Sequence, residues 1–178
     1  MSSVAVSGVS SGSHEQELEK LFREHYRMLY RTAYSILGNT ADAEDVPQTV
    51  FLRLLRSGIT PDVRVNPKGY LFRAAVNLSL NVLRSRKRHA VAGDAERLEI
   101  PGDVSRSNLL EDTDSRLSEA IAQMEPEAAQ LVILRYVHGQ SDADIAKMLG
   151  TSRGTIAMRL LRARARLKKL MQSLEEEK

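Results

Sequence analysis

The chain has 178 residues, a net charge of +3, and a composition in which 42% of residues are hydrophobic but only 4% are aromatic. It contains no Cys, which excludes disulfides and thiolate metal sites, and its four His residues show no ligand spacing, so we expect neither metal nor cofactor. The sequence has no apolar run of membrane-spanning length and no signal peptide, and we therefore expect a cytoplasmic protein without membrane insertion. Its polar start predicts a disordered tail over residues 1–14.

Two helices are predicted at the start of the folded part. Apolar residues recur at helical spacing over residues 15–37, and Gly38 is suited to end that helix. A second helix is expected over residues 40–57, but Pro47 would lie inside it and cost about 3 kcal/mol through a lost hydrogen bond and a clash. A restart capped by Asp45 is the alternative, so we expect a kink or break close to residue 44.

A loop over residues 58–65 should precede a third helix over residues 67–87. Its predicted buried face comprises Leu71, Ala74, Ala75, Leu78 and Val82. Residues three or four apart on the other side form one polar stripe, made of Arg73, Asn77, Asn81, Arg84 and Arg88. Between residues 63 and 93 there are seven cations and no acid, a charge that suits phosphate contact. The Asn amides could bond base edges, although exposed Asn is also ordinary on helices.

The charge inverts after the third helix. Residues 90–110 have no steady period and predict a flexible linker, and residues 94–127 hold ten acids against three arginines. This acidic linker could keep the chain soluble or lie in a basic channel. A second domain is expected over residues 111–174, beginning with one helix at 114–124 and another at 126–139.

The strongest pattern is a helix-turn-helix over residues 141–170. Ser141 can cap its first helix with an acid three positions on, Gly150 can end that helix, and Thr151 or Ser152 can cap the second. Residues 151–170 carry seven cations and no acid. A solvated surface helix is one interpretation of that charge, but its position directly after a helix-turn-helix pattern favours DNA binding.

Three stretches in this order resemble the bacterial extracytoplasmic-function sigma factors, the smallest group of the sigma-70 family. DAEDVPQTVFLRLL resembles the family's polymerase-docking region, and NPKGYLFRAAVNLSLNVLRSRKR resembles its minus-ten reader. EPEAAQLVILRYVHGQSDADIAKMLGTSRGTIAMRLLRARARLKKL resembles its minus-thirty-five reader. The resemblance covers roughly residues 17–172.

The resemblance implies an all-α fold with two small helical domains, over residues 15–89 and 111–174, joined by the acidic linker. It implies a sigma factor without enzymatic activity that binds core RNA polymerase, directs it to promoter DNA and assists melting. The implied polymerase contacts are the beta-prime clamp and the beta flap. An anti-sigma factor is a further partner of such proteins.

The same resemblance assigns roles to three groups of residues. The group expected to bind core polymerase is Asp42, Glu44, Asp45, Gln48 and Phe51. The group expected at the minus-ten element is Arg73, Asn77, Asn81, Arg84, Arg86, Lys87 and Arg88. The group expected at the minus-thirty-five element is Arg153, Thr155, Met158, Arg159, Arg162 and Arg166. The loop over residues 58–66, together with Asn77, would capture an unstacked minus-ten base.

The sequence departs from the family pattern at a few positions, and another class of protein competes with it. Pro47 stands where the family usually has an aliphatic residue, and Ala157 and Met158 stand where it often has Lys and Ser. A free-standing helix-turn-helix transcription regulator is the alternative, although residues 15–88 show no effector pocket or response-regulator pattern. An enzyme is the weakest option because no nucleophile or Gly-rich phosphate loop is recognisable.

Overall fold

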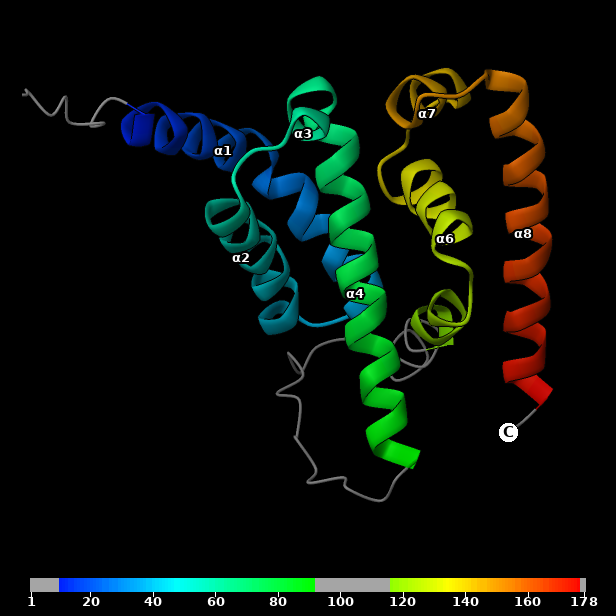
Figure 1. The fold of residues 1–178 in the computed structure, drawn as a ribbon. Coiled ribbons are helices and arrows are strands. Elements are labelled where there is room, and N and C mark those ends of the chain that lie inside the picture. Colours follow the sequence, from blue (N-terminus) through cyan, green and yellow to red (C-terminus); the bar gives the residue numbers. More distant parts are fainter. Residues whose placement is uncertain (1–9, 92–115, 177–178) are drawn as a thin grey trace, which may run out of the picture.

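The computed structural model describes residues 10–91 and 116–176, and every regular element in these two stretches is a helix (Figure 1). The first stretch, the N-terminal half, contains α1 (Ser10–Leu37), α2 (Thr40–Ser57), α3 (Pro61–Val65) and α4 (Pro67–Val91). The second stretch, the C-terminal half, contains a helical segment over residues 116–122, α6 (Pro126–Val132), the π-helical turn η1 (Ile133–Val137), α7 (Asp142–Leu149) and α8 (Arg153–Glu176).

Several boundaries differ from those expected. α1 begins at Ser10, so the last five residues of the predicted tail are helical, and residues 1–9 lie outside the described part. α4 extends to Val91, and the predicted linker beyond it also lies outside the described residues. The predicted loop after α2 contains the short helix α3, because Pro61 sets a helical φ in the first turn and Val63 is fully buried.

The predicted break near residue 44 is wrong, because α2 runs as one helix from Thr40 to Ser57 with Pro47 inside it, whereas the alternative of a kink stays a prediction. Asn39 caps this helix, since its side-chain Oδ1 accepts a hydrogen bond of 2.9 Å from the backbone N–H of Asp42. Pro47 has no N–H to donate, but its ring is buried with its neighbours on the packed side of the helix. Packing of that whole side keeps the helix continuous despite the lost hydrogen bond.

The first apolar cluster, the N-terminal core, lies between α1, α2 and α4. Its buried members include Leu29, Val50, Phe51, Leu54 and Leu71. The predicted inward face of α4 belongs here, with Leu71 and Ala75 fully buried. This core is built from a continuous stretch of the chain.

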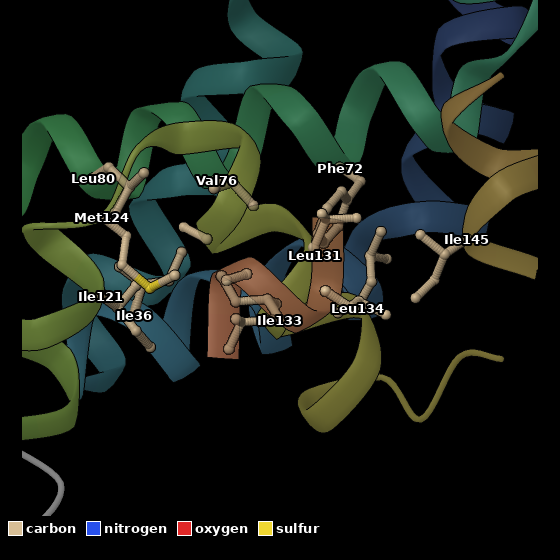
Figure 2. Close-up of a cluster of buried hydrophobic side chains, with 14 of the residues drawn as sticks. Ile36, Phe72, Val76, Leu80, Ile121, Met124, Leu131, Ile133, Leu134 and Ile145 are labelled. Carbon is tan, nitrogen blue, oxygen red and sulfur yellow. The ribbon is translucent and has the colours of Figure 1, made fainter. Parts of the chain in front are cut away.

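The second cluster, the joint core, is shared by the two halves (Figure 2). Phe72, Val76 and Leu80 of α4 point toward residues of the C-terminal half, among them Met124 and Ile133. All three α4 residues are fully buried, and Ile36 of α1 joins them. α4 therefore has two buried faces, one toward each core, and the sequence pattern had predicted only the first.

Candidate nucleic-acid interface

Most of the polar stripe predicted on α4 lies on the side of that helix that neither core covers. Asn77, Asn81 and Arg88 are exposed, and Arg73 is half-buried. Tyr70 lies at the start of the same strip, three residues before Arg73, and is half-buried because it packs against the N-terminal core. It was missed from the sequence, although its helical spacing from Asn77 was the available signal. The strip thus combines an aromatic ring, amide groups and cations.

Arg84 belongs to the predicted stripe, but its guanidinium contacts the other half of the chain. Its Nε and Nη2 donate hydrogen bonds of 3.1 and 2.9 Å to the backbone carbonyls of Ala122 and Met124. These carbonyls lie at the end of the helical segment over residues 116–122, where a cation is favourable. Arg84 thus holds the two halves together in this arrangement. The side chain of Lys87 lies outside the described part.

Arg86 and Asp42, assigned to different contacts by the resemblance, form an ion pair with each other. Partial burial lowers the pKa of Arg86 below its usual range. Asp42 also belongs to the first turn of α2, where Asn39 caps the helix. The pair ties the end of α4 to the start of α2, so both side chains have a structural partner here.

One side of α2 is open to solvent and mixes acidic and apolar residues. Three members of the predicted polymerase-binding group are exposed on it, namely Glu44, Asp45 and Gln48. Leu52 and Leu55 follow Gln48 by one and two turns, and each is 50% exposed. Both leucines were missed from the sequence; the signal was two apolar residues outside the buried period of the helix. We name these five residues the α2 face.

Phe51, which was predicted to contact polymerase, lies in the N-terminal core instead. It is only 6% exposed, and its ring meets that of Phe22 edge-on at a centroid distance of 4.8 Å. Large aromatic rings supply much of the burial in a small helical core. Phe51 therefore supports the α2 face from beneath.

The helix-turn-helix has the local geometry that its sequence predicts. Ser141 Oγ accepts from the N–H of Asp144, and the Ser141 N–H donates back to the Asp144 carboxylate, forming a capping box. Gly150 ends α7 with a φ of 67°, in the left-handed region. Ser152 caps α8, since its Oγ accepts a 3.1 Å hydrogen bond from the N–H of Thr155.

α8 packs one face inward and presents the rest to solvent. Ile156 and Leu160 are buried in the joint core, and Thr155 is half-buried. The exposed members of the predicted minus-thirty-five group are Arg153, Met158, Arg159, Arg162 and Arg166. Arg159 approaches Glu127 at 3.8 Å on the surface, a contact of little energetic weight. α8 therefore offers its cations on an open surface.

Other kinds of site find little support in the described residues. Within residues 10–91 and 116–176, no three His, Asp or Glu side chains are grouped so that they could hold a metal ion. Among the helices that the structure describes, none combines the length and apolar character needed to span a bilayer.

Two family models match the chain, one in each half. The model for Sigma-70 region 2 matches residues 21–89, and the model for Sigma-70, region 4 matches residues 114–167. Among solved structures, CnrH in complex with the cytosolic domain of CnrY is 20% identical with a TM-score of 0.53, covering 91% of this chain and 92% of that one. That likeness supports the fold.

Curated relatives give the same assignment. The ECF RNA polymerase sigma factor SigM of Mycobacterium tuberculosis is 32% identical over 153 residues, which cover 86% of this chain and 76% of SigM. SigL of the same species is 30% identical over 159 residues, covering 88% of this chain and 90% of SigL. SigE of Mycolicibacterium smegmatis is 32% identical over 157 residues, covering 84% of this chain and 60% of SigE.

The structure and the family matches lead to the same assignment. The N-terminal half has a helix with a basic strip and matches sigma-70 region 2, and the C-terminal half has a basic helix-turn-helix and matches region 4. The chain belongs to the extracytoplasmic-function sigma factors of the sigma-70 family, non-enzymatic initiation factors that direct promoter recognition by RNA polymerase.

Proposed function

We propose that three separate surfaces of this sigma factor make its three contacts during initiation. The α2 face binds the beta-prime clamp of core polymerase, the open strip of α4 reads the minus-ten element, and the exposed side of α8 binds the minus-thirty-five element. These roles extend the family assignment to individual residues of this chain.

The α2 face suits a protein partner better than nucleic acid. Its acidic residues, Glu44 and Asp45, would repel phosphate, whereas a basic helical partner would attract them. Leu52 and Leu55 are both half exposed and add an apolar patch beside the acids. Apolar anchors rimmed by charge are typical of protein–protein interfaces.

The open strip of α4 is the observation that carries the proposal. α4 is buried toward both cores, and Asn77 and Asn81 lie on its remaining exposed side. Neither residue therefore has a role in core packing. Asn is a poor helix former in a helix interior, and neither residue caps a helix end. Amide groups beside Arg73 and Arg88 can bond a base edge while the cations hold phosphate.

α8 supports the third contact through charge and exposure together. Arg153, Arg159, Arg162 and Arg166 are exposed along a helix that follows the tight turn at Gly150. A recognition helix enters the major groove with its N-terminal residues near the bases and with cations near phosphates. Met158, 53% exposed, could contact apolar base surface such as a thymine methyl.

The joint core sets a condition on this proposal. Elements centred near positions −10 and −35 lie about 25 base pairs apart, which is roughly 85 Å along B-form DNA. α4 and α8 both contribute side chains to the joint core, so they lie within one packed unit. The two halves must therefore separate when both helices bind one promoter.

The experiment for the minus-ten role replaces Asn77 with Ala. Holoenzyme is reconstituted, and open-complex formation is measured on four templates that differ only at one minus-ten base. We expect Asn77→Ala to relax discrimination among the four bases by about 1–3 kcal/mol, the usual value of a good base contact. Binding to core polymerase should be unchanged.

Gln16→Ala is the matched control, because Gln16 is an exposed amide on α1 and does not belong to the α4 strip. It should leave the ranking and spacing of the four bases as they are in the parent. If Asn77→Ala also keeps that spacing, Asn77 does not read the base.

If the parent chain footprints promoter DNA without core polymerase, the free-standing regulator becomes the better description.

Two further partners, the beta flap of polymerase and an anti-sigma factor, are predictions. A contact of the C-terminal half with the beta flap follows from the resemblance. An anti-sigma factor would need an apolar surface to cover, and α8 offers Leu161 beside Met158, 60% and 53% exposed.

A further inference from the structure

His138 is one of the residues through which the two halves of the chain contact each other. It follows η1 in the C-terminal half, and its Nε2 lies 2.8 Å from Oγ1 of Thr32 on α1. Its ring also meets the ring of Phe72 on α4 edge-on, with centroids 5.8 Å apart. Thr32 and Phe72 are both fully buried. One imidazole therefore contacts both long helices of the N-terminal half.

The two hydrogen bonds of Thr32 favour one tautomer of His138. The Thr32 hydroxyl donates its hydrogen to the backbone carbonyl of Met28 at 2.8 Å. With that hydrogen on the carbonyl, the Thr32 oxygen accepts, which assigns the donated hydrogen to His138 Nε2. A neutral imidazole protonated on Nε2 satisfies this arrangement, and a second proton would enter at Nδ1 and create a cation.

The charged groups around His138 disfavour that cation. Arg31 faces it from α1 and donates a 3.0 Å hydrogen bond to the carbonyl of Val137, and Lys68 faces it from α4. On its own side, Arg135 and Asp142 approach each other at 3.8 Å. Burial, followed by the positive charges of Arg31 and Lys68, lowers the pKa of His138 from its ordinary 6.5 to about 4.

We propose that His138 is a proton-sensitive latch between the two halves: the neutral imidazole holds them together, and protonation at Nδ1 releases them. Separation exposes the ring to water and removes it from Thr32 and Phe72. The open form then binds a proton more readily than the closed form, so acidification favours opening. Full stability of the closed form is present above about pH 6.5 and declines as the pH falls toward 4.

Two further hydrogen-bonding side chains between the halves, in the part of the chain that the structure describes, do not change charge in this range. Asn66 Nδ2 donates to the carbonyl of Met148 at 2.7 Å, and Arg84 donates to two carbonyls. An amide and a guanidinium keep their charge from pH 4 to 8. Neither of these side chains would therefore add a response to pH that could be mistaken for that of His138.

The test uses the full chain and its lack of native Cys. Exposed Ser57 and Ser173 lie in different halves and can be changed to Cys for a pair of dyes. Energy transfer between the dyes is followed from pH 7.5 to 5.5, with helix content by circular dichroism as the check on folding. We expect the open-to-closed ratio to rise about tenfold over this interval without loss of helix.

Two histidine variants decide whether the response belongs to the latch. His138→Gln has no proton to gain, so its dye distance should not depend on pH, whether it settles closed or open. His25→Gln is the matched control, because His25 also has a pKa lowered by burial but lies within the N-terminal half. It should respond to pH as the parent does.

A direct NMR titration of His138 provides a second measurement. Its pKa should lie well below 6.5 in the parent and return toward 6.5 in a variant that opens the junction at all pH values. The proposal is overturned by a parent dye distance that is independent of pH. It is equally overturned if His138→Gln keeps the response or if His25→Gln abolishes it.

Discussion

α4 and α8 are the two long basic helices of this sigma factor, and they differ in how much of their surface is packed. α4 is buried toward both cores, whereas α8 is buried along one face only. The cations follow the same division, since Arg84 on α4 donates to carbonyls of the other half while Arg162 on α8 is exposed. α8 offers its charge to DNA directly, but α4 divides its charge between DNA and the packing of the chain.

The largest difference between the two helices should come from truncating one apolar side chain on each and comparing the losses in the free energy of unfolding. Leu80 of α4 is fully buried in the joint core, and Leu161 of α8 is 60% exposed. We expect Leu80→Ala to lower the free energy of unfolding by about 2–5 kcal/mol, because it leaves a cavity. Leu161→Ala should change it by no more than about 0.5 kcal/mol. Urea denaturation of both variants tests the contrast, which fails if their losses are equal.

An arginine pair sharpens the same contrast. Arg84→Ala removes two charged hydrogen bonds to Ala122 and Met124, and we expect a loss of about 1.5–3 kcal/mol in the free energy of unfolding. Arg162→Ala should leave that free energy nearly unchanged. In holoenzyme on a promoter, however, Arg162→Ala should reduce the slope of log affinity against log salt by about 1.

Arg164→Ala is the control for the salt measurement. The Arg164 guanidinium lies 5.6 Å from the centre of the Tyr136 ring, on another side of α8 from Arg162. Its removal should leave the salt slope in place. Equal slopes for the parent and Arg162→Ala would show that Arg162 is a solvated surface residue that does not contact phosphate.

Glycines near the starts of the two helices should give effects of opposite sign. A Cβ at Gly69 of α4 would lie 2.6 Å from the carbonyl oxygen of Met148 and also meet the Asn66 side chain. Gly69→Ala should therefore lower stability by about 1–3 kcal/mol and favour separation of the halves. Gly154→Ala of α8 meets open space beyond Ser152 and should raise stability by about 0.4–1 kcal/mol. Thermal melts that move in the same direction would contradict this contrast.

Local signals in the sequence predicted the all-helical fold and the helix-turn-helix. These signals are the capping residue Ser141, the terminating Gly150 and the helical spacing of apolar residues. Each depends on residues that are close together in the sequence, so each can be recognised without the structure. The joint core was not predictable in this way. Phe72, Val76 and Leu80 were not assigned to the buried face of α4, because their partners lie far away in the sequence.

The site residues show the same limit. Exposed Asn77 and Asn81 follow from helical spacing alone, and so do Glu44 and Gln48. Phe51 was assigned to the polymerase contact by its place in the family pattern, whereas the period of α2 turns it into the N-terminal core. Arg84 and Arg86 were assigned to the minus-ten element by the resemblance, and that role stays a prediction. Their contacts with a carbonyl and a carboxylate were not predictable, because folding brings these partners near from distant parts of the sequence.

The distance between the two halves tests most directly whether α4 and α8 bind one promoter together. The dye-labelled Ser57→Cys, Ser173→Cys chain is measured free at pH 7.5 and again in holoenzyme bound to a promoter with both elements. The account predicts a short distance in the free chain and an increase by tens of ångströms on the promoter, since the elements lie roughly 85 Å apart. An unchanged distance in a transcribing complex would contradict it.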